Sequence, residues 1–273
     1  MKTMNKTLAW LCAAVLTLTL VSAANAEAGK QRTGKVVRIK GDARYSTGNK
    51  IWQPLKVGTV ITSGNVVQTA PNSFVDIVVN EEETAAAVSV KPISTASAPS
   101  SGGAGGGGAA ATPDQDVIRV LDDTYLVFDS MTATATGSDT VTETLLDLKK
   151  GSIFGSVKKQ AAASRFEVKI PNGVAGIRGT IFLIKASGLI ACLQGSVVAA
   201  YTSSSGDVNT QVVGGGQEFN CATGTGNAMS SGTSSSMSSM ANDSNYSSQK
   251  GGKKGRKNTA SNYGSDHVSN SKP

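Results

Sequence analysis

The sequence is poor in the residues that most enzyme active sites need. It contains one histidine, His267, and three cysteines among 273 residues. A single histidine close to the C-terminus cannot build a Ser-His-Asp triad, a Cys-His dyad or a multi-histidine metal site. Apolar residues make up 39 % of the chain, below the roughly 45–50 % of a typical globular protein. We therefore expect a protein that is not an enzyme, that carries no cofactor or metal, and that has part of its length outside any packed core.

Long apolar runs are also absent, with one exception at the N-terminus. Residues 8–21 are apolar, follow Lys2 and Lys6, and precede the small residues Ala24 and Ala26. This pattern is typical of a secretory signal peptide, residues 1–26, with cleavage between Ala26 and Glu27. A membrane anchor is the alternative, but the run is shorter than the roughly 20 residues that a spanning helix needs. No later run is long enough, so we expect an exported chain without a transmembrane segment, in the periplasm, at the cell surface or outside the cell.

Only two cysteines remain after the predicted cleavage, Cys192 and Cys221. An even number of cysteines in an oxidising compartment favours a disulfide. Both end apolar segments, so they could face each other across neighbouring strands. Two buried thiols are the alternative. Their number and spacing exclude a Cys-x-x-Cys redox motif and a thiolate metal site.

The composition divides the mature chain into four parts. Residues 30–80 and 116–221 have the composition of β-structure, and together they predict one domain over residues 30–221. Residues 81–115, rich in glycine, alanine and serine, predict a flexible insert in that domain. Residues 222–273, rich in serine, glycine and lysine and without periodic apolar positions, predict a disordered tail.

Alternation of apolar and polar residues predicts the strands of the domain. It runs through residues 37–45, 75–79 and 165–170, and a period of two is typical of a half-buried strand. Residues 181–184 are all apolar, which suits a strand buried on both faces. Residues 30–221 hold no helical apolar period, so we predict an all-β fold with many short strands, in a β-sandwich or a β-helix-like stack.

The most specific motif lies at residues 170–182. It combines a strand, a Pro-Asn-Gly turn, a segment of small residues, an arginine between two glycines, and a buried strand. With its surroundings it resembles the FecR domain family, whose characteristic pieces are matched in order. Those pieces are residues 34–41, 64–73, 148–151, 171–182, and 195–197 with 214–217.

The resemblance implies an all-β module at the periplasmic or cell-surface side of an envelope. In the best-known members it is the outer half of a transmembrane regulator that passes a signal to a cytoplasmic sigma factor. Since we find neither the membrane helix nor the anti-sigma helical domain in this sequence, we expect a stand-alone secreted form. Gly176, Arg178, Gly179 and Thr180 are its candidate motif residues, either for contact with a partner or for the structure of the turn. For Arg178 the structural alternative is that it satisfies backbone carbonyls between buried strands.

A few other residues invite a functional interpretation. Trp52 could stack on a sugar or a partner, or it could anchor the core or a corner. The carboxylates Asp122, Asp123 and Asp129 lack the spacing of a calcium loop and are more typical of a turn.

The net charge of +7 belongs mostly to the two ends of the chain. Without Lys2 and Lys6 it is +5, and residues 224–273 account for +4 of that. Residues 27–223 carry 18 basic against 17 acidic residues, so nucleic-acid recognition by the domain is not expected.

The leading hypothesis is a non-enzymatic exported envelope protein that acts as a binding or signal-receiving module. Its partner would be an envelope protein or a surface polymer. The alternative is a structural or adhesion protein whose basic tail holds an anionic surface polymer.

Overall fold

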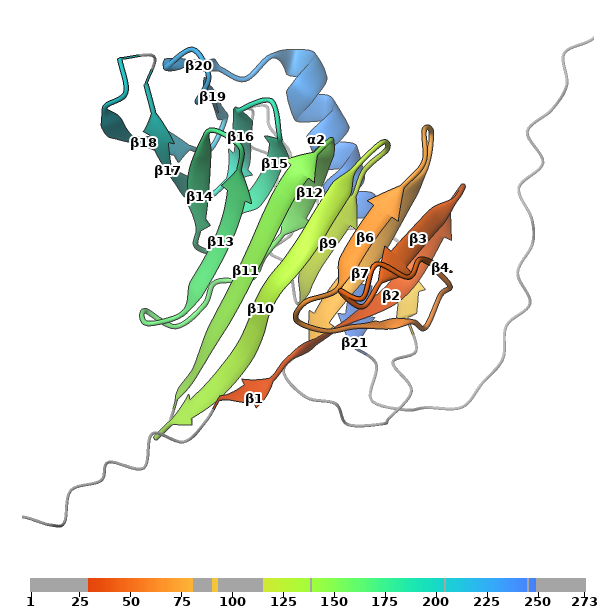
Figure 1. Cartoon of the computed structure of the whole chain (residues 1–273). Helices are drawn as coiled ribbons and strands as arrows, with labels where there is room; N and C mark the ends of the chain where they lie inside the picture. The colour runs from red at the N-terminus through yellow and green to blue at the C-terminus, as the bar shows by residue number, and fades with distance from the viewer. Residues whose placement is uncertain are drawn as a thin grey trace, which may run out of the picture.

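Two β-sheets face each other and bury their inner surfaces between them (Figure 1). The structure is a computed structural model, and it describes residues 29–80, 90–92, 115–137, 139–203, 205–244 and 246–248. The predicted signal peptide with its Ala26–Glu27 cleavage site lies outside the described residues. The described residues contain no helix with both the length and the hydropathy needed to cross a bilayer.

The larger sheet, sheet A, has ten strands in the order β18-β17-β14-β13-β11-β10-β6-β3-β4, with β1 paired to β10. Its strands are β1 (Lys30–Gln31), β3 (Ala43–Ser46), β4 (Gln53–Pro54), β6 (Val66–Thr69), β10 (Tyr125–Thr136), β11 (Asp139–Lys150), β13 (Arg165–Ile170), β14 (Gly173–Ile177), β17 (Ser196–Thr202) and β18 (Val208–Gly214).

The smaller sheet, sheet B, has nine strands in the order β20-β19-β16-β15-β12-β9-β7-β2-β5. Its strands are β2 (Thr33–Lys40), β5 (Val60–Ile61), β7 (Phe74–Asn80), β9 (Asp116–Val120), β12 (Ser152–Ser156), β15 (Ile181–Lys185), β16 (Leu189–Gln194), β19 (Gln217–Asn220) and β20 (Thr225–Ala228).

The chain passes back and forth between the two sheets as it moves from one end of the sandwich to the other. Of the strand pairs described, β11 with β13 is the parallel one, and the others are antiparallel. The prediction of an all-β fold is therefore confirmed. Of the two architectures predicted, the structure has the two-sheet sandwich.

The core between the sheets consists mainly of valine and isoleucine side chains, with leucine and phenylalanine, from both inner faces. Phe166 of sheet A meets Phe182 of sheet B edge to face, with ring centroids 6.3 Å apart. Both side chains are fully buried. Since packing of the two inner faces is the main source of stability in such a fold, this contact joins the halves of the sandwich.

The alternating patterns predict some strands correctly and one wrongly. In β13, Phe166, Val168 and Ile170 are buried as expected. In β15, residues 181–184 are buried on both faces. The pattern over residues 37–45, however, is not one strand: the chain turns at Gly41, which has φ +73°, and β2 and β3 lie in different sheets.

The prediction of disorder from residue 222 onward is wrong for residues 222–244. This segment forms β20 and then helix α2 (Ser231–Asp243). A further short strand, β21 (Tyr246–Ser248), pairs with β8 (Val90–Pro92), which lies within the predicted insert. The remainder of the tail and of the insert lies outside the described residues.

Helix α2 forms because its apolar side chains pack against an apolar surface on the outer face of sheet B. Serine is a poor helix former, and the sequence of α2 is rich in it. Ser230 caps the N-terminus by accepting a hydrogen bond from the Thr233 backbone N–H at 3.1 Å. Met237 and Ala241 are buried in a cluster with four residues of sheet B: Phe154, Ile181, Leu183 and Ala191. Burial in the tertiary structure thus outweighs the weak local preference.

One buried ion pair holds the first described strand segment to the rest of the fold. Arg32 is 1 % exposed and its Nη2 donates to Asp116 Oδ2 at 3.1 Å, while its Nη1 donates to the Thr144 hydroxyl at 3.0 Å. Asp116 also accepts from the Lys158 backbone N–H at 3.0 Å and from Gln160 Nε2 at 3.2 Å. A buried charge survives only with such partners.

We expect Asp116→Ala to lower the free energy of unfolding by about 3–5 kcal/mol, because it leaves the Arg32 guanidinium buried without its counterion. Urea denaturation of the full chain measures this change. The matched control is Lys150→Ala, which removes an exposed ion pair with Asp123 (3.2 Å) and should cost less than about 1 kcal/mol. Equal effects of the two substitutions would contradict the structural role of the buried pair.

Candidate functional site

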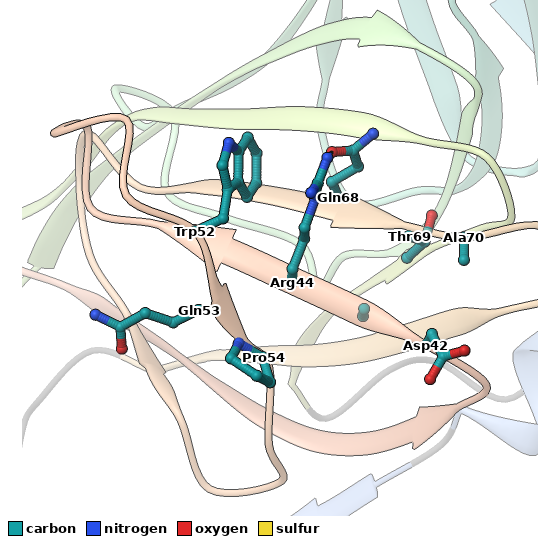
Figure 2. A pocket seen from close by; sticks show the side chains of 9 residues that line it. Asp42, Arg44, Trp52, Gln53, Pro54, Gln68, Thr69 and Ala70 are labelled. Atoms are coloured by element: carbon teal, nitrogen blue, oxygen red, sulfur yellow. Dashed lines mark hydrogen bonds between the residues drawn. The ribbon is translucent and has the colours of Figure 1, made fainter.

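A groove of about 450 Å³ lies on the outer side of sheet A, at the end formed by β3, β4 and β6 (Figure 2). Its apolar walls come from Ala43, Trp52, Pro54 and Ala70, and its polar atoms come from Asp42, Arg44, Gln53, Gln68 and Thr69. Strand register explains this grouping. Across the neighbouring strands β4, β3, β6 and β10, the successive partners in register are Pro54, Arg44, Gln68 and Tyr125.

The Arg44 side chain is held in place at the centre of the groove. Its Nε and Nη2 both donate to Gln68 Oε1, at 2.9 and 2.8 Å. Its guanidinium carbon lies 4.6 Å from the centroid of the Trp52 ring, and Figure 2 shows the two side chains next to each other. Trp52 in turn meets Tyr125 edge to face, with centroids 6.0 Å apart. The cation–π contact and the shared hydrogen bonds pre-organise the site before anything binds.

The groove has the composition of a binding site for a small ligand or a short peptide segment. Its volume falls within the range of roughly 300–1,000 Å³ that ligand pockets occupy. Arg44 offers donors, Asp42 offers a carboxylate, and the Trp52 ring and Pro54 provide apolar surface. Trp52 immediately precedes β4, at a corner of sheet A, and it also lines the groove. Its position therefore agrees with both interpretations from the sequence, an anchor at a corner and a ring that is open to stacking. The sequence alone missed the roles of Arg44 and Gln68, although their positions on outward faces of alternating strands were a usable signal.

The four candidate motif residues build a crossing between the sheets. Gly176 lies in β14 of sheet A, and the chain enters β15 of sheet B after Thr180. At Gly179 φ is +68°, and a Cβ there would lie 2.9 Å from the Lys159 Cα, so only glycine fits without strain. Thr180 is buried, and its backbone oxygen accepts from the Val157 N–H at 2.9 Å. Gly179 and Thr180 therefore have structural roles.

Arg178 does not fit the structural interpretation, which assumes a buried side chain. The structure places it at the exposed side of this crossing, and no hydrogen bond or ion pair of its side chain occurs within the described part of the chain. It therefore does not satisfy carbonyls between buried strands. The side chain is available to a partner. It lies away from the groove lined by Trp52 and Arg44 (the Trp52 groove), since β14 and β3 are separated by four strands of sheet A.

The predicted disulfide is not present. Cys192 and Cys221 are both free and buried. In the pairing of β16 with β19, Cys192 lies opposite Gln217, whereas Cys221 follows Asn220, the partner of Leu189. An offset of four residues at about 3.3 Å each separates the two cysteines by about 13 Å along the strands, beyond the ~7 Å limit between Cα atoms for a disulfide. The alternative of two buried thiols is the one that the structure shows.

The carboxylates Asp122, Asp123 and Asp129 do not gather into a site. All three are exposed, and Asp123 lies in the turn between β9 and β10 with φ +53°. This agrees with the prediction of a turn for Asp122 and Asp123, whereas Asp129 lies within β10. Among the described residues, no three histidine, cysteine or acidic side chains lie in a group that could hold a metal ion.

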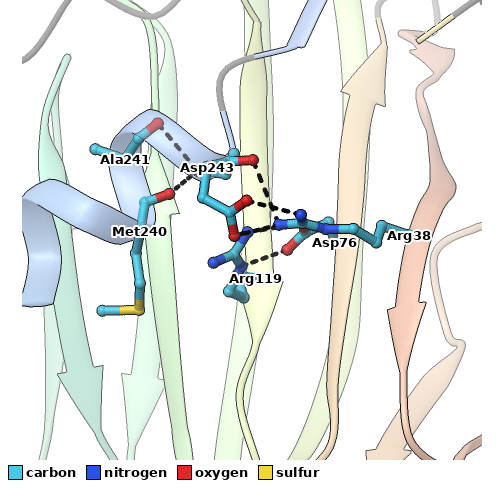
Figure 3. A network of polar contacts seen from close by, with 7 residues as sticks. Arg38, Asp76, Arg119, Met240, Ala241 and Asp243 are labelled. Atoms are coloured by element: carbon cyan, nitrogen blue, oxygen red, sulfur yellow. Dashed lines mark hydrogen bonds and ion pairs between the residues drawn. The ribbon is translucent and has the colours of Figure 1, made fainter. Parts of the chain in front are cut away.

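A second cluster of charges joins helix α2 to sheet B (Figure 3). Asp76, fully buried, accepts from Arg38 Nε at 2.8 Å and from Arg119 Nε and Nη2 at 2.6 and 2.9 Å. Asp243, the last residue of α2, contacts the same two arginines: Oδ2 lies 2.6 Å from Arg38 Nη2 and 3.1 Å from Arg119 Nη2. Phe74 lies under both guanidinium groups, at 5.0 and 4.6 Å.

This cluster attaches the C-terminal end of the helix by charge, while Met237 and Ala241 attach it by apolar contact. The hydrogen bonds from Arg38 hold the pKa of Asp243 below its ordinary value, and the charges of Arg38 and Arg119 act in the same direction. A lowered pKa means that the attachment is fully present above the ordinary value of 3.8 and is lost as the pH falls through the lowered pKa.

Comparison with known proteins supports the family resemblance for part of the chain. Residues 109–198 match the model of the family described as FecR protein. Two crystal structures of a protein provisionally described as an anti-sigma factor, from Parabacteroides distasonis ATCC 8503, are similar at 18 % identity with a TM-score of 0.31. The alignment covers 44 % of this chain and 54 % of that one, so it spans about half of that protein's length. A comparison with curated proteins found no match.

The resemblance to the FecR family is thus confirmed for residues 109–198, which run from the end of the insert through β9–β16 into β17. The predicted motif pieces at residues 148–151, 171–182 and 195–197 fall inside this segment. The pieces at residues 34–41, 64–73 and 214–217 fall outside it. The Trp52 groove also lies outside it, but rests on Tyr125 within it.

We expect both native thiols to resist alkylation. Burial raises the pKa of Cys192 and of Cys221 to about 11, from 9.0, which lowers the thiolate fraction near pH 8 by roughly a hundredfold. Iodoacetamide followed by mass spectrometry should leave both unmodified in the native chain and modify both after unfolding without a reductant. Because burial favours the neutral thiols, their contribution to the free energy of unfolding is fully present below pH 9. It is lost as the pH rises towards 11. Failure to alkylate the unfolded chain would contradict the free thiols.

We expect Asp243→Asn to loosen α2 without unfolding the sandwich, because the arginines keep Asp76 but lose their second carboxylate. Hydrogen exchange of the α2 amides should accelerate roughly fivefold, equivalent to about 1 kcal/mol for a half-exposed ion pair. Exchange in β13 should not change. The control is Asn242→Ala, at the exposed neighbouring position, for which no acceleration is expected. Equal exchange in the variant and the wild type would show that the ion pairs do not hold the helix.

Proposed function

We propose that this chain is a non-enzymatic, exported envelope protein whose FecR-like domain acts as a binding or signal-receiving module. The observation that carries the proposal is the FecR family match over residues 109–198, within a two-sheet β-sandwich. The match supports a signal-receiving or regulatory role. The partner proposed is an envelope protein or a surface polymer.

The Trp52 groove is the contact site that best fits this role. Trp52, Arg44 and Gln68 form a chain of contacts that keeps polar donors and an aromatic ring in one arrangement. Such an arrangement binds without the entropic cost of ordering flexible side chains. The groove lies on the outer face of sheet A, where a partner has access to it.

The proposals of export and of a non-enzymatic role rest on the sequence. A basic start, an apolar run and small residues before Glu27 support export. A single histidine, His267, leaves the chain without the common histidine-based catalytic arrangements.

Two measurements on intact cells test the proposal. Fractionation should place a mature chain beginning at Glu27 outside the cytoplasm. A photo-crosslinking amino acid in place of Gln53, at the groove, should then give a discrete cross-linked product. Trp52→Ala should reduce this product severalfold, because it removes the ring against which Arg44 is held. A cytoplasmic chain, or a product unaffected by Trp52→Ala, would overturn the proposal.

Two controls accompany the cross-linking experiment. The same photo-crosslinker in place of Thr225, exposed in β20 on sheet B, should not give the product. Deletion of residues 249–273 leaves all the described elements intact. Loss of envelope retention with normal cross-linking at Gln53 would favour the alternative, a structural protein whose basic tail holds an anionic polymer.

A further inference from the structure

Strand β18 is an open edge of sheet A and is unusually long for one. The two large sheets end at four strands: β18 and β4 in sheet A, β20 and β5 in sheet B. β4 and β5 have two residues each and β4 contains Pro54, whereas β18 has seven residues and no proline. Open edges are normally short, charged, or interrupted by proline, because they otherwise pair with other strands. β18 has none of these protections.

The outer face of the β17–β18 hairpin is also apolar. Val198, Val208 and Val212 are 44, 77 and 56 % exposed. Val198 and Val212 are direct partners across the hairpin, and Val208 lies on the same face, four residues before Val212. Three exposed valines therefore lie on one face of the hairpin beside the open edge, two of them side by side and the third further along β18, and exposed apolar side chains grouped on one face are typical of an interaction surface.

No described segment covers this edge. Figure 1 shows the hairpin at the far end of the sandwich from β4, and a groove of about 420 Å³ separates β18 from β20. Within β18, Gln211 Nε2 donates to the Val212 carbonyl oxygen at 2.9 Å. A partner strand would replace this local bond with a backbone donor.

The strand is complementary to itself in the antiparallel direction. When Thr210 of one copy lies opposite Thr210 of another, Val208 lies opposite Val212, and Val212 opposite Val208. Each Val212 then has Val198 of its own hairpin on one side and a valine of the other copy on the other side. Residues 208–214 carry no charged side chain, so no like charges meet, and β-branched cross-strand pairs are favourable.

We propose that this protein forms a two-fold symmetric dimer in which the β18 edges of two copies pair antiparallel about Thr210, producing a continuous sheet across both molecules. The near-neutral charge of residues 27–223 allows two copies to approach. A two-fold interface of this kind closes on itself, so assembly stops at the dimer. The interface lies far from the Trp52 groove, which stays open in both copies.

The oligomeric state of the full chain tests the proposal. Sedimentation velocity should show a dimer, and Val208→Lys with Val212→Lys should weaken it by roughly tenfold or more, because lysine on an edge strand disfavours pairing. The matched control is Val57→Lys, which changes a valine that is 63 % exposed at the opposite end of the sandwich and should leave the dimer unchanged. A monomeric wild type, or a dimer insensitive to the paired substitution, would overturn the proposal. Assemblies larger than a dimer that Val57→Lys disrupts would also overturn the proposal, because they would show that opposite ends of the sandwich join head to tail.

A cysteine on the two-fold axis provides a second test that does not depend on weakening the dimer. In a Cys12→Ser chain, Thr210→Cys should form a disulfide between copies under mild oxidation, because directly opposite residues have Cα atoms about 4.5–5.5 Å apart. Thr225→Cys, on the edge strand β20 of sheet B, should not. Circular dichroism confirms that each variant folds. Absence of the Thr210→Cys cross-link in a chain that folds would exclude this register.

Discussion

Mutual burial of the two inner sheet faces is the constraint on which the rest of this structure depends. Neither sheet could exist alone, because each presents a row of valine, isoleucine and phenylalanine side chains on one side. The contact of Phe166 with Phe182 shows how closely the halves interlock. The chain supplies both faces by crossing repeatedly between the sheets. At each crossing the backbone has to turn sharply, and the family motif at Gly179 is one of these turns.

The most deeply buried charged side chains lie where this sandwich brings them to a partner. The Arg32–Asp116 pair ties the chain before β2 to the start of β9, on either side of the predicted insert. The Asp76 cluster ties α2 to the outer face of sheet B. In both cases residues far apart in sequence complete one another's hydrogen bonds, so these attachments form only when the sandwich does.

The proposed binding site depends on the same scaffold. Arg44 lies in β3, Gln68 in β6, and Trp52 immediately before β4. The three side chains meet because these strands are adjacent in sheet A. Tyr125 supports them from β10, inside the segment that matches the FecR family. A groove outside the matched segment is therefore physically connected to it through one sheet.

The all-β class follows from the amino-acid sequence, because alternation within β13 and the apolar run of β15 depend only on which residues are buried. The sequence also identifies the family motif and Trp52. The strand register depends on tertiary packing, and it sets the separation of Cys192 from Cys221 and the contact of Arg44 with Gln68. Tertiary packing also explains why a serine-rich segment forms helix α2, because the apolar surface of sheet B that the helix covers comes from strands distant in the sequence. Local patterns specify which face of a strand is buried, whereas the identity of its neighbours is set by long-range packing.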